Sequence, residues 1–72
     1  MEFEKWGRRI RAFRKLKGFT QKKLADEIGV SVSALGEVER GMREPSIKLL
    51  EKIADKLEIS IEDLIPKEEQ EN

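Results

Sequence analysis

The sequence predicts an all-α protein, a compact bundle of five helices. Apolar residues recur every three or four positions in successive stretches of the 72-residue chain, which is the spacing of a helix with one buried face. Ser, Thr and Gly stand at the boundaries between these stretches, and such residues cap or end helices. A chain this short forms one domain that buries only about 60% of its unfolded surface, so its stability depends on well-formed helices.

The first predicted helix has one apolar face and ends before Gly18. A glycine at this position can take the left-handed conformation that stops a helix. Phe19 is then expected to pack back toward the core. The apolar face consists of Phe3, Trp6, Ile10 and Phe13, with Leu16 near its edge.

Two short helices are predicted between residues 20 and 40, joined by a tight turn at Gly29. Thr20 and Ser31 stand directly before them and can accept hydrogen bonds from the free amide groups of a first helical turn. The buried stripes of these helices are Leu24, Ala25 and Ile28 in the first and Leu35 and Val38 in the second.

Counted from Gln21 as position one, Ala stands at position five, Gly at nine, and apolar residues at four, eight, ten, fifteen and eighteen. With a Gln-x-x-Leu-Ala opening and a Glu-Arg-Gly close at residues 39–41, this pattern resembles the helix-turn-helix of the phage repressor (Cro/cI-like) and XRE-like family. The segments RIRAFRKLKGFTQ and IADKLEIS are similar to the family's first and fourth helices. The resemblance implies a lambda-repressor-like DNA-binding domain in residues 1–66. A helical hairpin without a ligand is the alternative.

Two further helices are predicted after the loop that contains Pro45, which cannot continue a helix. Ser46 is the expected cap of the fourth helix. Ser60 is that of the fifth, where Asp63 three residues on is close to a capping box. Residues 67–72, KEEQEN, have nothing to bury and are expected to form a disordered acidic tail. The apolar stripes are Ile47, Leu50, Ile53, Ala54 and Leu57 in the fourth helix and Ile61, Leu64 and Ile65 in the fifth.

The composition argues against an enzyme and against a bound metal or cofactor. The chain has no Cys and no His, which removes disulfides, thiolate and imidazole metal ligands and the commonest general base. No nucleophile with a base is recognisable, so no catalytic, cofactor-binding or metal-binding residues are predicted. No apolar run approaches the about 20 residues that span a membrane, and the N-terminus lacks the apolar core of a signal peptide. We therefore expect a cytoplasmic protein with no membrane partner.

The charges are unevenly distributed along a chain whose net charge is zero. Residues 1–23 carry nine Lys and Arg against two Glu, whereas residues 24–72 carry six against thirteen Asp and Glu. The two parts therefore have net charges of +7 and −7, which favours one electropositive end suited to a polyanion. Solvated helix faces are the alternative interpretation of most individual charges.

The resemblance implies that the helix after Ser31 enters the major groove of double-stranded DNA. The residues at the family's base-reading positions are Val32, Ser33, Gly36 and Glu37. Val32 can contact a thymine methyl, Ser33 discriminates little, and Glu37 can accept from a cytosine amino group or remain a solvated charge. The family more often has serine or a larger residue in place of Gly36. The glycine indicates either close approach of the backbone to DNA or weak readout.

The resemblance also implies phosphate contacts around the start of the second helix, where backbone amide groups favour anions. The implied contacts are Thr20, Gln21, Lys22, Ser31, Arg40 and Arg43. Arg14 and Glu39 match a pair that forms a salt bridge in phage repressors, between the first helix and the end of the recognition helix. Such a pair fixes orientation more than it adds net stability.

The predicted function is that of a sequence-specific transcriptional regulator, a repressor, that binds double-stranded DNA without a cofactor. One recognition helix covers few base pairs, so we expect a homodimer on DNA. Its interface is expected to include Ile61, Leu64 and Ile65, with core packing as the alternative role of Leu64. A protein-interaction module, or an antitoxin or co-activator with a protein partner, is the alternative function, because a chain without net charge could use the same fold to hold a protein.

Overall fold

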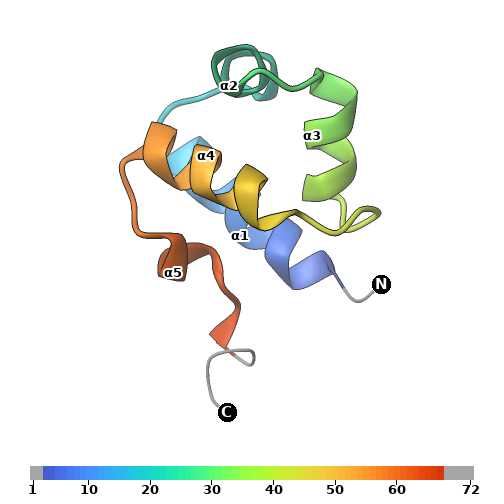
Figure 1. The fold of residues 1–72 in the computed structure, drawn as a ribbon, viewed down its shortest axis with the longest axis vertical. Helices are drawn as coiled ribbons and strands as arrows, with labels where there is room; N and C mark the ends of the chain where they lie inside the picture. Colours follow the sequence, from blue (N-terminus) through green and yellow to red (C-terminus); the bar gives the residue numbers. More distant parts are fainter. Residues whose placement is uncertain (1–2, 68–72) are drawn as a thin grey trace.

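The computed structural model describes residues 3–67 and contains five α-helices within that range (Figure 1). They are α1 (Glu4–Leu16), α2 (Gln21–Ile28), α3 (Val32–Glu39), α4 (Ile47–Leu57) and α5 (Ile61–Leu64). α1 and α4 cross at the centre of the molecule, with α2 and α3 toward one end and α5 toward the other (Figure 1). The predicted all-α bundle is confirmed. The predicted acidic tail, apart from Lys67, lies outside the described residues.

The helices α2 to α5 begin at hydroxyl side chains, as the sequence predicts. Each hydroxyl oxygen accepts a hydrogen bond from an amide of the first turn that the helix itself cannot pair. The capping residues are Thr20, Ser31, Ser46 and Ser60. Asp63 completes the capping box by accepting from the Ser60 amide at 3.1 Å. Gly29 ends α2 in the left-handed conformation, with φ of +78°, which turns the chain from α2 into α3.

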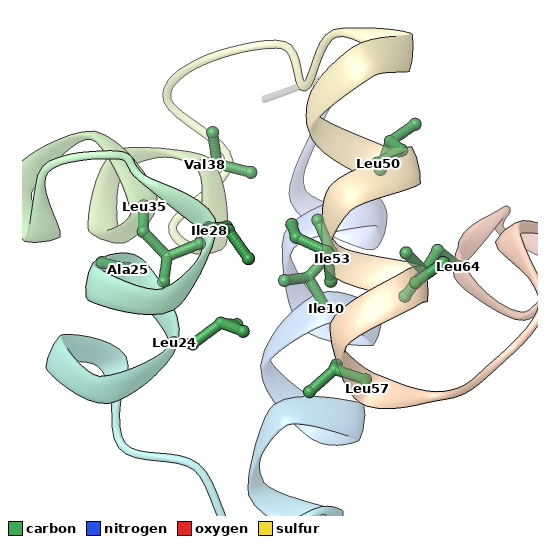
Figure 2. Packing of buried hydrophobic residues seen from close by; sticks show 11 residues of the cluster. Ile10, Leu24, Ala25, Ile28, Leu35, Val38, Leu50, Ile53, Leu57 and Leu64 are labelled. Atoms are coloured by element: carbon green, nitrogen blue, oxygen red, sulfur yellow. The ribbon is translucent and has the colours of Figure 1, made fainter.

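An apolar cluster fills the space between the α2–α3 pair and the helices α1, α4 and α5 (Figure 2). Both stripes predicted for α2 and α3 belong to it, and each of their residues is at most 7% exposed. This burial fixes which faces of α2 and α3 remain available to solvent. The cluster consists of Ile10, Leu24, Ala25, Ile28, Leu35, Val38, Leu50, Ile53, Ala54, Leu57 and Leu64.

The structure corrects the predicted positions of Ile47 and Leu64. Ile47 does not belong to the buried stripe of α4, because it is 68% exposed. It occupies the first position of α4 and borders an open hollow of about 650 Å³, together with Trp6 and Pro45, instead of lying under another helix. The interface role is wrong for Leu64 and its alternative, core packing, is confirmed, because α5 packs this 0% exposed side chain against the core between α1 and α4.

α1 and the end of α3 approach each other closely at Gly7. A Cβ atom added to Gly7 would lie 2.3 Å from the carbonyl oxygen of Glu39 and 2.5 Å from that of Val38, where no side chain fits. Gly41, two residues after the end of α3, has φ of +78° and lies against the backbone of Glu4. The two glycines therefore let α1 lie near enough to α3 for polar side chains of both helices to meet.

A buried ion pair joins α1 to α3. Arg14 donates from Nε to Oε2 of Glu39 at 2.7 Å and from Nη2 to Oε1 at 3.1 Å, and the two side chains are only 8% and 2% exposed. The third nitrogen, Nη1, donates to the carbonyl oxygen of Phe19 at 2.8 Å, which holds the segment between α1 and α2. Gln21, the first residue of α2, donates from Nε2 to Oε1 of Glu39 at 2.9 Å. The Glu39 carboxylate therefore connects α1, α2 and α3.

A more exposed carboxylate connects α2 to α4. Oε2 of Glu27 lies 3.1 Å from Nζ of Lys23 on the same helix, and Oε1 lies 3.2 Å from Nζ of Lys56 on α4. Hydrogen bonds from Lys23, which has the larger effect, and from Lys56 lower the pKa of Glu27 below its ordinary value. The stabilisation from this group is therefore present above the ordinary pKa of glutamate, and it is lost as the pH falls through the lowered value.

Replacement of Gly7 by alanine is expected to destabilise the protein, although alanine is favoured over glycine within a helix by about 1 kcal/mol. The new methyl group would meet two carbonyl oxygens, and overpacking of this kind costs about 1–3 kcal/mol or more. Gly36→Ala is the matched control, because the nearest atom to its added Cβ is Nη1 of Arg40 at 3.1 Å, the end of a movable side chain. Urea unfolding should show a loss of stability for Gly7→Ala alone. Equal free energies of unfolding for the two variants would contradict the close approach of the helices.

The variant Arg14→Met is expected to lower the free energy of unfolding by about 3–5 kcal/mol, because Glu39 would stay buried without its counter-charge. The double variant Arg14→Met with Glu39→Leu should recover much of that loss, since no uncompensated charge is left. Urea unfolding of the wild type, both single variants and the double variant measures the coupling. Losses that simply add would show that the two side chains do not act as a pair.

Candidate nucleic-acid interface

An open cleft of about 500 Å³ lies where α1, the start of α2 and the end of α3 meet. Its lining combines exposed cations with the N-terminus of α2, where amide groups that the helix cannot pair create a partial positive charge. Both features favour an anion, and phosphate is an anion that helix N-termini commonly bind. The lining includes Arg11, Thr20, Gln21 and Arg40, besides the buried pair Arg14 and Glu39.

Three of the predicted phosphate contacts, Thr20, Gln21 and Arg40, border this cleft. Oγ1 of Thr20 accepts from the amide of Lys23 at 3.0 Å, and the hydroxyl group still has its proton to donate. Gln21 is held at the edge of the cleft by its bond to Glu39. Arg40 is exposed, and its Nη1 and the amide group of Gln21 both lie within 4 Å of the position of a Cβ added to Gly36.

Arg11 also lines the cleft, although it is not among the site residues predicted from the sequence. It lies on α1, three positions before Arg14, so the two side chains project from the same side of the helix. Because Arg14 is expected to reach the end of α3, this spacing places Arg11 at the same junction. The position of Arg11 could therefore be predicted from its spacing in the sequence, but only if the Arg14–Glu39 pair is assumed.

The residues predicted to read bases lie in different environments on α3. Val32 is 45% exposed, Ser33 is exposed and Glu37 is partly exposed. Gly36 is buried, and a Cβ added to it would lie 3.1 Å from Nη1 of Arg40 and 3.7 Å from Oε1 of Gln21. Gly36 therefore leaves room for the side chains at the cleft, a role that the sequence alone does not indicate.

Lys22 and Arg43, the other predicted phosphate-contacting cations, already have carboxylate partners. Nζ of Lys22 lies 3.1 Å from Oδ2 of Asp26, and Nη2 of Arg43 lies 2.6 Å from Oε1 of Glu37. All four of these side chains are at least 37% exposed, and such surface pairs contribute only about 0–1 kcal/mol. The Asp26 carboxylate can therefore give way to another anion at Lys22 at little cost. Ser31 caps α3 by accepting from the Ala34 amide.

The chemistry available at this surface is anion binding. The cleft offers guanidinium groups, backbone amides and a hydroxyl group, all of which donate hydrogen bonds. Within residues 3–67, no group of three or more His, Cys, Asp or Glu is arranged to hold a metal ion. In the same described part of the chain, no helix is both long enough and apolar enough to cross a membrane.

The sequence matches a helix-turn-helix family model (HTH_3) over residues 10–64, which includes all of α2 to α5. It is 59% identical over 68 residues to the HTH-type transcriptional regulator YazB of Bacillus subtilis, and the match covers 94% of this chain and 99% of YazB. It is 40% identical over 60 residues to the transcriptional regulator SinR of the same species, where the match covers 82% of this chain but only 54% of SinR.

Solved structures of proteins with related sequences have the same fold. The restriction-modification controller protein C.AhdI from Aeromonas hydrophila matches with a TM-score of 0.84 and 38% identity, over 89% of this chain and 97% of that chain. A structure of SinR in complex with DNA matches with a TM-score of 0.77 and 40% identity, over 82% of this chain and 95% of that chain. The family model and these relatives agree with the spacing of residues 21–41, and the chain belongs to the XRE-like helix-turn-helix family.

Proposed function

We propose that this chain is a transcriptional regulator, a repressor, that binds double-stranded DNA sequence-specifically. The observation that carries the proposal is the cleft with Arg11, Gln21 and Arg40 beside the exposed face of α3. The cleft suits a phosphate group, and the major groove is about 12 Å wide and admits an α-helix. The similarity to SinR, which has been solved in complex with DNA, and to the regulator YazB supports the proposal.

In the proposed complex, one phosphate group occupies the cleft. Arg11 and Arg40 supply charge, the amides of Gln21 and Lys22 donate along the helix axis, and the hydroxyl of Thr20 donates from the rim. Lys22 and Ser31 are proposed to contact further phosphates, whereas Arg43 is bound to Glu37. These contacts carry no sequence information of their own, but they fix the orientation of α3 on the duplex.

With the cleft on a phosphate, the start of α3 is proposed to enter the major groove. Val32 and Ser33 then face base edges at its first turn, and Glu37 follows one turn later on the same side as Ser33. Gly36 contributes space for the cleft residues rather than a contact of its own. The proposed base-reading residues are therefore Val32, Ser33 and Glu37.

The variants Arg11→Ala and Arg40→Ala are expected to weaken binding to all duplexes alike. Each should lower the slope of log affinity against log salt concentration by about one, because one phosphate contact is lost. Arg8→Ala is the matched control, since Arg8 is an exposed arginine of α1 that borders a different hollow near Pro66. Fluorescence anisotropy at several salt concentrations measures the slopes.

An unchanged slope for Arg11→Ala and Arg40→Ala would refute the phosphate cleft. A wild-type chain that binds no duplex even at low salt would refute DNA binding as a whole, and it would favour a module that binds a protein partner.

We also propose that the chain binds DNA as a homodimer, because one recognition helix covers too few base pairs for high specificity. Ile61 on α5 and Ile65 directly after it are only partly buried. Because Leu64 is buried, Ile61 and Ile65 are the proposed interface residues. Sedimentation on a selected duplex should give two chains per duplex with half-sites about 10 base pairs apart. One chain on a saturated duplex would contradict the dimer.

A further inference from the structure

The loop after α3 brings an arginine back to the exposed side of the recognition helix. The Gly41 amide donates to the carbonyl oxygen of Val38 at 3.1 Å, and the Met42 amide donates to that of Glu37 at 2.9 Å. These bonds reverse the chain directly after α3. The side chain of Arg43 therefore reaches α3, where Nη2 donates to Oε1 of Glu37 at 2.6 Å.

Arg43 and Arg40 lie in different surroundings beside α3. Arg40 borders the cleft with Gln21, whereas Arg43 lines a smaller hollow of about 260 Å³ with Ala34 and Val38. Since Arg43 does not line the phosphate cleft, it need not share the role of Arg40. Its contact with Glu37 connects it instead to a residue on the exposed face of α3.

A carboxylate that faces DNA is repelled by the phosphates unless a cation compensates its charge. Arg43 provides that cation, and its bond to Oε1 leaves Oε2 of Glu37 able to accept. In the major groove, cytosine presents an amino donor, guanine presents two acceptors, and adenine presents an amino donor next to an acceptor. The carboxylate therefore favours cytosine over the purines.

On the basis of the proposed DNA binding, we propose that Glu37 and Arg43 form one sequence-reading unit that selects cytosine in the major groove. Glu37 is the base-reading residue, and Arg43 is the positioning residue that holds its carboxylate and compensates its charge. The unit supplies discrimination that Val32, an apolar side chain, and Ser33, a hydroxyl that can donate or accept, do not.

If Glu37 and Arg43 act as this unit, Glu37→Gln should change the affinity for two kinds of duplex in opposite directions. Affinity for the preferred duplex should fall at least about fivefold, the lower end of what one good base contact contributes. Affinity for duplexes without that cytosine should rise, because a negative charge near the phosphates is removed. The selected base should change from cytosine to adenine, since a glutamine amide can pair with both groove groups of adenine.

The experiment first selects bound sequences from a random duplex library with four proteins: the wild type, Glu37→Gln, Arg43→Ala and Arg40→Ala. The affinity of each protein is then measured for the duplex that the wild type selects and for a duplex in which the base pair containing the selected cytosine is replaced. Arg43→Ala should reduce the cytosine preference, which Glu37→Gln should also remove. The matched control, Arg40→Ala, should weaken both duplexes equally and keep the preference. Glu37, Arg40 and Arg43 are not buried, so the variants are expected to fold, which thermal unfolding checks.

A cytosine preference that survives Glu37→Gln would overturn the assignment of Glu37. A preference lost in Glu37→Gln but intact in Arg43→Ala would overturn the pair as a unit and leave Arg43 a phosphate contact. In both cases the wild type still binds DNA with the expected salt dependence, so the proposed function stands. A wild type without salt-dependent binding would overturn both.

Discussion

The carboxylate of Glu39 is enclosed by protein, and it stays compensated there because Arg14 and Gln21 both donate to it. Since these donors come from α1 and α2, a group at the end of α3 sets how the three helices meet. A buried ion pair adds little net stability over an apolar contact, but the loss of one partner leaves a charge without compensation. The pair therefore acts mainly on orientation. It can form only because Gly7 lets the backbones of α1 and α3 approach closely.

The same constraint determines where positive charge remains at the surface. Because Arg14 is compensated inside the protein, the exposed charge at the start of α2 comes from Arg11 and Arg40, next to the unpaired amides of the helix. A chain whose net charge is zero can thus present a local anion site. Exposed pairs such as Lys22 with Asp26 are weak enough to exchange their carboxylates for phosphates. Local arrangement, rather than total charge, is what suits this surface to an anion.

The helices and their limits could be predicted from the sequence because caps such as Thr20 and Ser31 act on residues within one turn. Helical spacing gives the apolar face of a helix but not which neighbour covers it. For this reason the sequence assigns the exposed Ile47 to the core and leaves the buried Leu64 open between an interface and the core. The role of Gly36 depends on how α1, α2 and α3 meet, and Arg11 can be placed at the cleft from its spacing only once the Arg14–Glu39 pair is assumed. The contact of Arg43 with Glu37 depends on a chain reversal after α3. Neither arrangement is visible in local spacing.

The most direct test of DNA binding through this surface is a titration of the isotope-labelled chain with a selected duplex, followed by NMR of the backbone amides. The largest shifts should fall at Gln21 and Lys22 and along residues 31–37, with small shifts in α4. The amide of Glu39 should shift little, because its side chain remains bound to Arg14 in the complex. Shifts concentrated in α4, with residues 21–22 and 31–37 unaffected, would contradict the placement of α2 and α3 on the DNA.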